Sequence, residues 1–362
     1  MSTTVEEIEK TETTTDKKDK LLLDSLEIKG YRCFEHLTIE KLGRVNLIVG
    51  KNNVGKTALL EGLWLFANGG YESLMFEILR ERNEIPPFQN GTMLVQPESS
   101  KGLRNLFFNR PSLDFIPAHL LKDFNVSFQI GEHINEDEKN LSFISKVFKV
   151  SAIPVSSNSM DAIPQTRTES SFDKKIENHF IKAGGLSEKK LVGFWDKIEQ
   201  LVLEDLVIKA LKIVANNLVD IRFSGYPSGA FSRVPVVRLE KATERIPLRS
   251  LGDGMTRLLG IASTLINCRN GILIIDEIES GLHYSVLPDV WKLIFKTAKD
   301  LNVQVFATTH SKDCIEAFAQ AAVDSPEDGM LVQLIRQGEN IVAKTIEEER
   351  LAQAINYEVE VR

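Results

Sequence analysis

The octapeptide GKNNVGKT at residues 50–57 is the feature that most constrains the fold of this chain. It satisfies the pattern G-x-x-x-x-G-K-[ST] and lies between an apolar run, RVNLIVG, and a segment with apolar residues at helical spacing, TALLEGLWLFAN. This context predicts a strand, a phosphate-binding loop and a helix in succession. An ordinary glycine turn before a helix is the alternative, but it does not account for the lysine and threonine that close the motif.

The residue types of this loop suit phosphate chemistry. Its glycines let backbone N–H groups point inward, and the start of the following helix adds partial positive charge. We expect Lys56 to contact the β- and γ-phosphates of a nucleotide, and the Thr57 hydroxyl to bind Mg²⁺. The predicted nucleotide-binding set comprises Gly50, Lys51, Asn52, Asn53, Val54, Gly55, Lys56, Thr57 and Ala58.

Two acids follow a second apolar run, in GILIIDE at residues 271–277. A buried parallel strand delivers such acids at its carboxyl end, where α/β sheets bind ligands. We expect Asp276 to hold Mg²⁺ and Glu277 to act on the water that attacks the γ-phosphate. Taken alone, the pattern is equally typical of a strand that enters a solvated loop, so its value comes from the phosphate loop.

Two weaker signals lie nearby in the sequence. The segment SLGDG at residues 250–254 precedes an apparent helix, where a hydroxyl and glycine N–H groups can form an anion site, although an N-cap and turn explain it equally well. His310 follows the apparent strand VQVFATT, which we expect to neighbour the acidic strand. An isolated histidine is more often structural, and its position is what makes this one a candidate.

The rest of the chain suggests an α/β protein with an interruption. Residues 1–20 are polar and are predicted to be disordered, whereas residues 186–218 carry an apolar stripe that predicts one long amphipathic helix. The end of the chain reads as a hairpin, LVQLIR and IVAKTI, followed by a helix that begins near Glu347. The predicted divisions are a tail at 1–20, an N-terminal lobe at 21–110, an insertion at 111–220 and a C-terminal lobe at 221–362.

Composition limits the setting of the protein. A net charge of −7 over 362 residues argues against a uniformly basic nucleic-acid-binding surface but allows a local one. Three cysteines without a CxxC pair predict neither a zinc site nor disulfides. The sequence has no signal peptide pattern and no apolar run long enough to cross a bilayer, so we expect a cytoplasmic protein with no membrane contact of its own.

The order of these motifs resembles a known family. A phosphate loop, a long insertion, SLGDG, ILIIDE and a histidine after the next strand look like the ABC-type ATPase heads of the RecF, SMC and OLD-nuclease group. The opening LEIKGYRCFEHLTIEKLGRVNLIVGKNNVGKTALLEGLWLF is similar to the N-terminal lobe of the RecF and OLD branch, and DEIESGLHYSVLPDVWKLI is similar to its C-terminal lobe. The resemblance covers roughly residues 22–85 and 200–355 and is strongest for OLD-like ATP-binding proteins without a Toprim domain.

The resemblance implies a P-loop fold with an N-terminal β-rich lobe, a central parallel sheet flanked by helices, and a mixed or helical insertion. It also implies a homodimer or higher homo-oligomer in which two heads enclose two ATP molecules with Mg²⁺. His310 takes the role of a switch histidine in that arrangement, and Arg32 matches a position that can approach the phosphates. The residues implied to act on the partner's ATP are Ser250, Gly252, Asp253, Gly254 and Ser280.

Some family features are missing or ambiguous in this sequence. A glutamine that senses Mg²⁺ is expected between the P-loop helix and the insertion, and both Gln89 and Gln96 fit. The 52 residues after His310 are accounted for by a helix, a hairpin and a final helix, so we expect no fused Toprim nuclease. An effector such as a nuclease or toxin is then expected to be a separate protein. The insertion is also too short for the arms of SMC proteins.

Three functions compete at this stage. The first is a stand-alone ATPase that acts as a switch or clamp in DNA repair or in defence against phage. The second is the ATPase subunit of a membrane transporter, which the 193 positions between Thr57 and Ser250 and the SLGDG sequence disfavour. The third is a nucleotide-gated scaffold with little turnover, against which Glu277 argues.

Residues 221–257 provide weak support for DNA binding through a local excess of four positive charges. A solvated face, or contacts with the phosphates of ATP, would explain this excess equally well. The basic residues are Arg222, Arg233, Arg238, Lys241, Arg245, Arg249 and Arg257.

Overall fold

A computed structural model describes residues 21–69, 72–85, 102, 104–109, 126–131, 145–154, 162–170, 176–225, 233–325 and 328–347. Its strands are β1 (Leu26–Tyr31), β2 (Phe34–Ile39), β3 (Val45–Val49), β4 (Val126–Gly131), β5 (Ser145–Pro154), β6 (Ala162–Ser170), β7 (Asn178–Ile181), β8 (Leu218–Gly225), β9 (Arg233–Leu239), β10 (Ile246–Pro247), β11 (Ile272–Ile275), β12 (Gln304–Thr308), β13 (Gly329–Gln337) and β14 (Asn340–Glu347). Its α-helices are α1 (Lys56–Ala67), α2 (Glu72–Glu81), α4 (Glu188–Leu201), α5 (Glu204–Leu211), α6 (Asp253–Asn267), α7 (Leu287–Asp300) and α8 (Lys312–Val323). Short 3₁₀ helices are η1 (Arg104–Leu106), η4 (Leu248–Leu251) and η5 (Tyr284–Val286).

The central sheet has the strand order β14-β13-β3-β12-β11-β7. Strands β13, β3, β12, β11 and β7 pair in parallel, and β14 closes one edge as the antiparallel half of a hairpin with β13. The expected α/β class with a parallel sheet is therefore confirmed, as is the C-terminal hairpin. Because parallel strands share one carboxyl edge, the segments that follow β3, β11 and β12 are brought together there.

Each strand of this sheet supplies side chains to two separate hydrophobic cores. In β11, Ile272 and Ile274 pack on the side of α1, whereas Leu273 and Ile275 pack on the side of α6, α7 and α8. The alternation follows from the two-residue period of a strand, and every residue of β11 is buried. A sheet covered on both faces holds its strand ends rigidly, which suits a site built at one edge.

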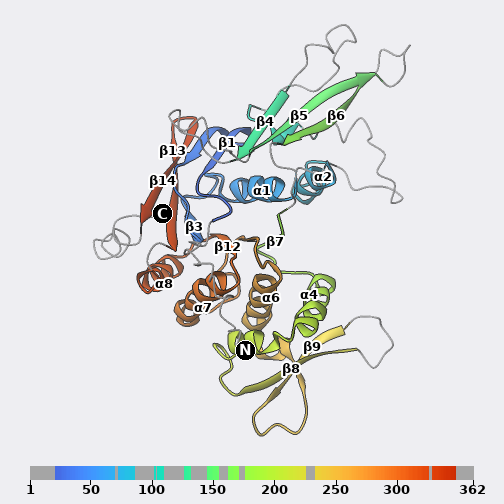
Figure 1. Ribbon diagram of the computed structural model, residues 1–362, viewed down its shortest axis with the longest axis vertical. Helices are drawn as coiled ribbons and strands as arrows, with labels where there is room; N and C mark the ends of the chain where they lie inside the picture. The colour runs from blue at the N-terminus through green and yellow to red at the C-terminus, as the bar shows by residue number, and fades with distance from the viewer. Residues whose placement is uncertain are drawn as a thin grey trace, which may run out of the picture.

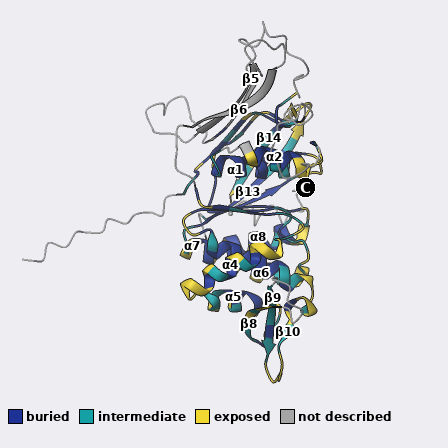
Figure 2. Cartoon of the chain, turned by 90° about the vertical axis from the view of Figure 1, so that its right-hand side faces the viewer, coloured by how far each residue is buried: buried dark blue, intermediate teal, exposed yellow. Residues whose placement is uncertain are grey.

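The N-terminal lobe covers one face of α1. Its sheet has the order β2-β1-β4-β5-β6 and is antiparallel throughout. Helix α1 lies between this sheet and the central sheet, with α2 beside it (Figure 1). Nearly the whole of α1 is consequently buried, from Lys56 to Ala67, which Figure 2 shows as dark blue.

Helices on the other face of the central sheet lead to a small outer sheet. Helices α6, α7 and α8 pack beneath the central sheet, α4 and α5 lie alongside α6, and the sheet β10-β9-β8 forms the far end (Figure 1). The single long helix expected at 186–218 is wrong. Val202 adopts a left-handed backbone (φ 57°) after α4, and its N–H bonds to the Glu199 carbonyl at 3.2 Å, so the chain turns before α5 begins.

Two further expectations concern the middle and the end of the chain. Strand β7 falls within the range that we assigned to the insertion, yet it pairs with β11 at the edge of the central sheet. Strand β4 falls in the same range and pairs with β1 in the N-terminal lobe. The final helix lies outside the described residues apart from Glu347, which is still part of β14. The tail at 1–20 also lies outside them.

Candidate functional site

The predicted phosphate loop joins β3 to α1 at the carboxyl edge of the central sheet. Gly50 and Gly55 have φ values of 142° and 97°, which side-chain-bearing residues rarely adopt. A Cβ at Gly55 would lie 2.7 Å from Cys33 Sγ, so the loop also lies against the turn between β1 and β2. Glycine is thus required for both backbone shape and close approach.

Lys56 occupies the start of α1 and points back into the loop. Its Nζ donates to the carbonyls of Gly50 at 2.6 Å and Lys51 at 3.1 Å. Burial lowers the pKa of Lys56, while the carboxylates of Asp276 and Glu277 oppose that shift. A lysine held among backbone carbonyls in this way is positioned for phosphate oxygens, which would raise its pKa again.

Asp276 and Thr57 meet across the edge of the sheet. Thr57 Oγ1 donates to Asp276 Oδ2 at 3.2 Å, and Thr308 Oγ1 donates to Asp276 Oδ1 at 2.5 Å. A hydroxyl and a carboxylate this close fit the oxygen ligands that Mg²⁺ takes from a protein when phosphates supply others. The residues present therefore fit a magnesium ion at this point.

Glu277 has a strained backbone that its neighbours hold in place. Its φ is 48°, and its N–H donates to Thr308 Oγ1 at 2.9 Å. Arg257 Nη2 donates to the carbonyls of both Asp276 and Glu277 at 2.8 Å, and Arg257 Nη1 donates to Lys182 O at 2.8 Å. A non-glycine residue in this conformation is typical of sites where the surrounding structure fixes a functional side chain.

His310 follows β12 and faces Glu277. The two side chains approach to 3.8 Å between His310 Nε2 and Glu277 Oε1, and each is more than one-third exposed. The backbone N–H of His310 donates to Glu279 Oε1 at 2.8 Å, which fixes the start of this segment. Both side chains are therefore free to contact a ligand in the adjoining cavity.

A cavity of about 950 Å³ lies over these groups. Its volume is in the range of pockets that hold cofactors and small molecules. The sequence-predicted residues on its lining are Arg32, Asn52, Asn53, Gly55, Lys56, Thr57, Ala58, Glu277 and His310. Gly50 and Lys51 instead accept hydrogen bonds from Lys56, and Val54 is buried beneath the loop.

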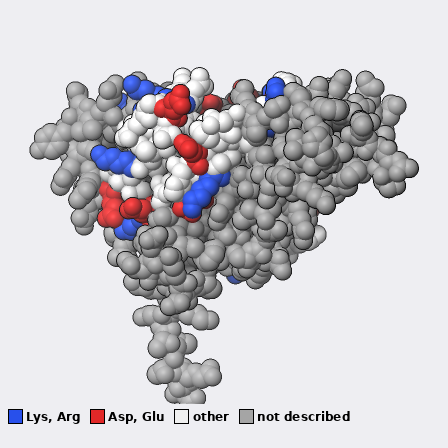
Figure 3. Space-filling model, turned by 90° about the horizontal axis from the view of Figure 1, so that it is seen from above, with Lys and Arg blue, Asp and Glu red and all other residues white. Residues whose placement is uncertain are grey.

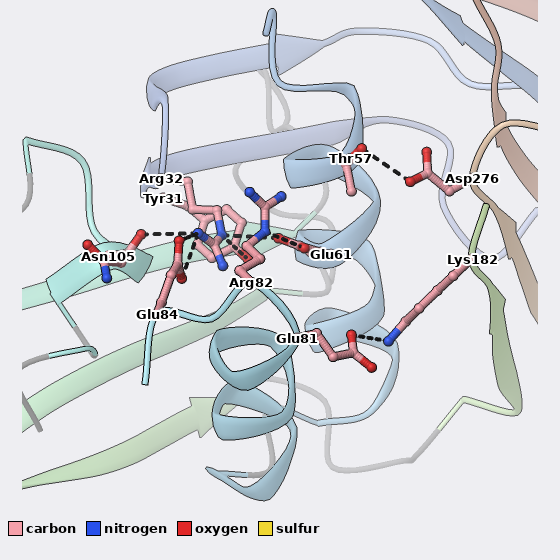
Figure 4. A network of polar contacts seen from close by, with 10 residues as sticks. All are labelled: Tyr31, Arg32, Thr57, Glu61, Glu81, Arg82, Glu84, Asn105, Lys182 and Asp276. Carbon is pink, nitrogen blue, oxygen red and sulfur yellow. Dashed lines mark hydrogen bonds and ion pairs between the residues drawn. The ribbon is translucent and has the colours of Figure 1, made fainter. Parts of the chain in front are cut away.

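Arg32 lines the cavity from the turn between β1 and β2, but most of its donors are committed elsewhere. Its Nε lies 3.0 Å from Glu61 Oε2, and its Nη1 donates to Glu84 Oε1 at 3.0 Å and to Asn105 O at 3.5 Å (Figure 4). Arg82 Nε donates to Glu61 Oε1 at 2.7 Å. Burial acts to lower the pKa of Arg32, yet the charges around it hold that pKa above its usual value. Its Nη2 is buried without a hydrogen-bond partner in the described chain.

The residues implied to act in trans lie away from this cavity. Among the described residues that line it, none belongs to the segment from Ser250 to Gly254. Ser250, Gly252 and Asp253 are exposed at the start of α6. A Cβ at Gly254 would lie 2.8 Å from Gly281 O, so this segment packs against the loop that contains Ser280. The two segments therefore form one surface.

Several of the basic residues of 221–257 are paired with acids or buried. Arg233 pairs with Asp196, and Arg245 pairs with Asp220. Arg249 and Asp253 are both 82% exposed with 3.7 Å between Nε and Oδ1, and Arg257 is buried among backbone carbonyls. The face seen from above in Figure 3 lies at the other end of the molecule from β8 and β9, and its described part carries acidic and basic side chains side by side. The ion pairs of Arg233 and Arg245 therefore offset part of the positive excess at residues 221–257.

Several residues of the site were not identified from the sequence. Thr308 hydrogen-bonds to both Asp276 and Glu277. The sequence feature that could have identified it is its position at a strand end, two residues before His310. Arg257 was counted among surface charges. Glu61, Arg82 and Glu84 had no motif to mark them. Gln89 and Gln96 lie outside the described residues.

Comparison with known proteins gives one family and several relatives. A profile described as "AAA domain, putative AbiEii toxin, Type IV TA system" matches residues 45–313. An ATP/GTP phosphatase of Helicobacter pylori is 22% identical over 340 residues, covering 83% of this chain and 88% of that protein. An uncharacterised protein of Methanocaldococcus jannaschii is 36% identical over 93 residues, covering 26% of this chain and 82% of that protein.

Two solved structures share the fold. An Smc head bound to the C-winged helix domain of ScpA has a TM-score of 0.55 at 14% identity, covering 91% of this chain and 99% of that one. An Smc head domain with an extended coiled coil, bound to the C-terminal domain of ScpA derived from Pyrococcus furiosus, has a TM-score of 0.52 at 12% identity, covering 93% and 99%. Within the described residues of this chain, no helix is both long and apolar enough to cross a membrane.

Proposed function

The chain belongs to the AAA-domain family whose description names a putative AbiEii toxin of type IV toxin–antitoxin systems, and from that premise we propose that it works as an ATP-driven switch in defence. It is an ATPase with the head fold of the RecF, SMC and OLD group. The proposal adds that its site is completed by a second copy, and that the cycle gates a separate effector protein.

The observation that carries the proposal is the meeting of three segments at one sheet edge. Lys56 and Thr57 come from the loop after β3, Asp276 and Glu277 follow β11, and His310 follows β12. Thr57 lies 3.2 Å from Asp276, and His310 lies 3.8 Å from Glu277, around one cavity. Binding of an anion would not require the Thr57–Asp276 and His310–Glu277 contacts in addition to the phosphate loop.

Each side chain has a role that follows from its position. Lys56 holds the β- and γ-phosphates, and Thr57 and Asp276 would hold Mg²⁺, which supplies charge neutralisation on the phosphates when bound. Glu277 orients the attacking water and accepts its proton, because it is exposed to the cavity while its backbone is fixed. His310 hydrogen-bonds the γ-phosphate beside it.

We propose that the exposed segment at the start of α6 contacts the ATP bound by a second copy of the chain. Ser250 presents a hydroxyl and Gly254 a backbone N–H group at a helix start, which favours an anion, whereas the Gly252 N–H donates to Arg249 O at 3.1 Å. They do not line the cavity of their own chain in the part that the structure describes. A head-to-head dimer related by a two-fold axis brings this segment to the partner's phosphate loop.

The effector is proposed to be a separate protein. The family description names a toxin–antitoxin system, and the Smc heads of similar fold are bound to another protein, ScpA. The ion pairs of Arg233 and Arg245 give no support to DNA contact at residues 221–257. We therefore propose a switch that acts on a protein rather than a clamp on DNA.

Complementation between two inactive variants tests the shared site. We expect Lys56→Ala and Ser250→Ala to lack ATP hydrolysis when each is assayed alone. After exchange of subunits, the mixed dimer contains one intact site, so about a quarter of the wild-type phosphate release should return. The matched control mixes Lys56→Ala with Glu277→Gln. Both residues are proposed to act on the ATP of their own chain, so each site of the mixed dimer stays inactive and no phosphate release should return. Absence of recovery with exchange verified by differently tagged chains would refute the trans arrangement.

A further inference from the structure

The cavity extends well beyond the phosphate loop. Lys56 and Thr57 line one end, whereas Asn105, Phe108 and Asn109 line it from the short segment that contains η1. Its volume of about 950 Å³ is near the upper end for small-molecule sites, which leaves room for a complete nucleotide. The wall at residues 104–109 therefore faces whatever is attached to the phosphates.

Phe108 differs from its two neighbours in this segment. Leu106 and Phe107 are buried at 0% and 2% exposure and belong to the hydrophobic core around α1. Phe108 is half-buried, and among the described residues it belongs to neither hydrophobic core. An aromatic ring placed on a polar cavity wall, rather than in the adjoining core, offers an apolar face to a ligand.

The segment is fixed relative to the phosphate loop. Phe108 N–H donates to Gly30 O at 2.9 Å, and Arg32 N–H donates to Leu106 O at 2.9 Å. Arg32 Nη1 reaches Asn105 O at 3.5 Å, as Figure 4 shows from close by. The turn that contains Arg32 and Cys33 touches Gly55, so the ring has a defined position relative to the phosphates.

We propose that this segment is the nucleoside wall of the site, with the Phe108 ring stacked on the nucleobase. The side-chain amides of Asn105 and Asn109 can each donate and accept hydrogen bonds, which suits the polar edge of a base or the ribose hydroxyls. The proposal rests on the proposed function, since it needs the phosphates to lie at Lys56. It further selects purine nucleotides, because a purine offers the larger face for stacking.

Calorimetry with two probes tests this wall separately from the phosphate end. ADP carries a nucleoside, and inorganic tripolyphosphate does not. We expect Phe108→Ala to weaken ADP binding by about 5- to 100-fold, the range that aromatic stacking on a base supplies. Binding of tripolyphosphate should remain at the wild-type level. Phe108→Tyr retains the ring and should restore ADP binding, which separates stacking from a folding defect.

Arg104→Ala provides a control in the same segment, because Arg104 is exposed and does not line the cavity. It should bind both probes as the wild type does. Equal losses of ADP and tripolyphosphate in Phe108→Ala, or no loss of either, would overturn the nucleoside wall. A wild-type protein that binds tripolyphosphate as tightly as ADP would also overturn it while sparing the proposed function. A wild-type protein that binds neither probe would overturn both.

Discussion

The two walls of the cavity over the phosphate-binding motif are built on different principles. The sheet-edge wall consists of Thr57 and Glu277, which line the cavity, and of their partners Asp276 and Thr308, all joined by hydrogen bonds of 2.5–3.2 Å. The N-lobe wall consists of Arg32, Arg82 and Glu84, which line the cavity, and of their partner Glu61, joined as opposite charges that are most deeply buried at Arg32 and Glu61. The first holds the groups that we propose to react, and the second consists of ion pairs within the N-terminal lobe.

This difference predicts separate consequences for substitution. A single hydrogen bond at a strand end can be removed at modest cost to folding, because the sheet is held by its buried faces. A buried charge that loses its partner destabilises the folded state strongly, whatever its distance from the chemistry. Changes in the sheet-edge wall should therefore affect turnover, and changes in the N-lobe wall should affect stability.

The largest effect is expected from Glu277→Gln. Loss of the proton acceptor should lower steady-state phosphate release by about 10² to 10⁴-fold, the usual contribution of a general base. Binding of ATP, measured by calorimetry, should be retained because the phosphate loop is untouched. A variant that hydrolyses ATP at the wild-type rate, or that loses stability instead of turnover, would break the comparison.

The next effect is expected from Glu61→Gln in the N-lobe wall. The side chains of Glu61 and Arg32 are 9% and 7% exposed, so removal of the carboxylate charge leaves Arg32 with Glu84 alone. We expect the free energy of unfolding in urea to fall by about 3 kcal/mol. Turnover per folded molecule should change little. A fall in turnover without a change in the free energy of unfolding would contradict the separate roles of the two walls.

A smaller effect is expected from Thr308→Val, which keeps the shape of the side chain but removes its hydroxyl. The Glu277 N–H loses its acceptor and Asp276 loses a donor, so stability should fall by about 1 to 2 kcal/mol. The Mg²⁺ concentration needed for half-maximal phosphate release should also rise, because Asp276 is less well oriented. Thr308→Ser retains the hydroxyl and should behave as the wild type in both measurements.

The smallest effect is expected from Arg82→Ala. Arg82 contacts the same Glu61 carboxylate, but its side chain is 35% exposed, so solvent screens the pair. We expect a loss of less than about 1 kcal/mol in urea unfolding. A loss as large as that of Glu61→Gln would show that burial does not determine how much each residue of this wall contributes to stability.

The same contrast explains what could be predicted from the sequence. The sheet-edge residues belong to contiguous motifs, and the rule that parallel strands share one carboxyl edge brought Asp276, Glu277 and His310 to the phosphate loop. The N-lobe wall joins Arg32 to Glu84 and Asn105, which lie 52 and 73 positions further along the chain. The spacing of apolar residues within one helix or strand does not predict contacts between residues this far apart in the sequence.

Two structural details could not be predicted from the local sequence pattern. The apolar stripe at 186–218 has helical spacing, but the stripe does not reveal that the chain turns at Val202. Strand β7 is short and follows a long polar stretch, and it becomes recognisable as a strand through its pairing with β11. The turn at Val202 is closed by a local hydrogen bond, whereas β7 depends on tertiary pairing.

Strand β7 also limits how this chain can be shortened. Ile181 O accepts from the Asp276 N–H at 2.8 Å, and Lys182 O accepts from Arg257, so the strand braces the segment that carries both acids. A deletion that trims the interruption must therefore rejoin the chain before Asn178. A tether attached just ahead of that residue would pull on β7. The hydrogen bond from Asp276 N–H to Ile181 O would carry that force to the segment with both acids.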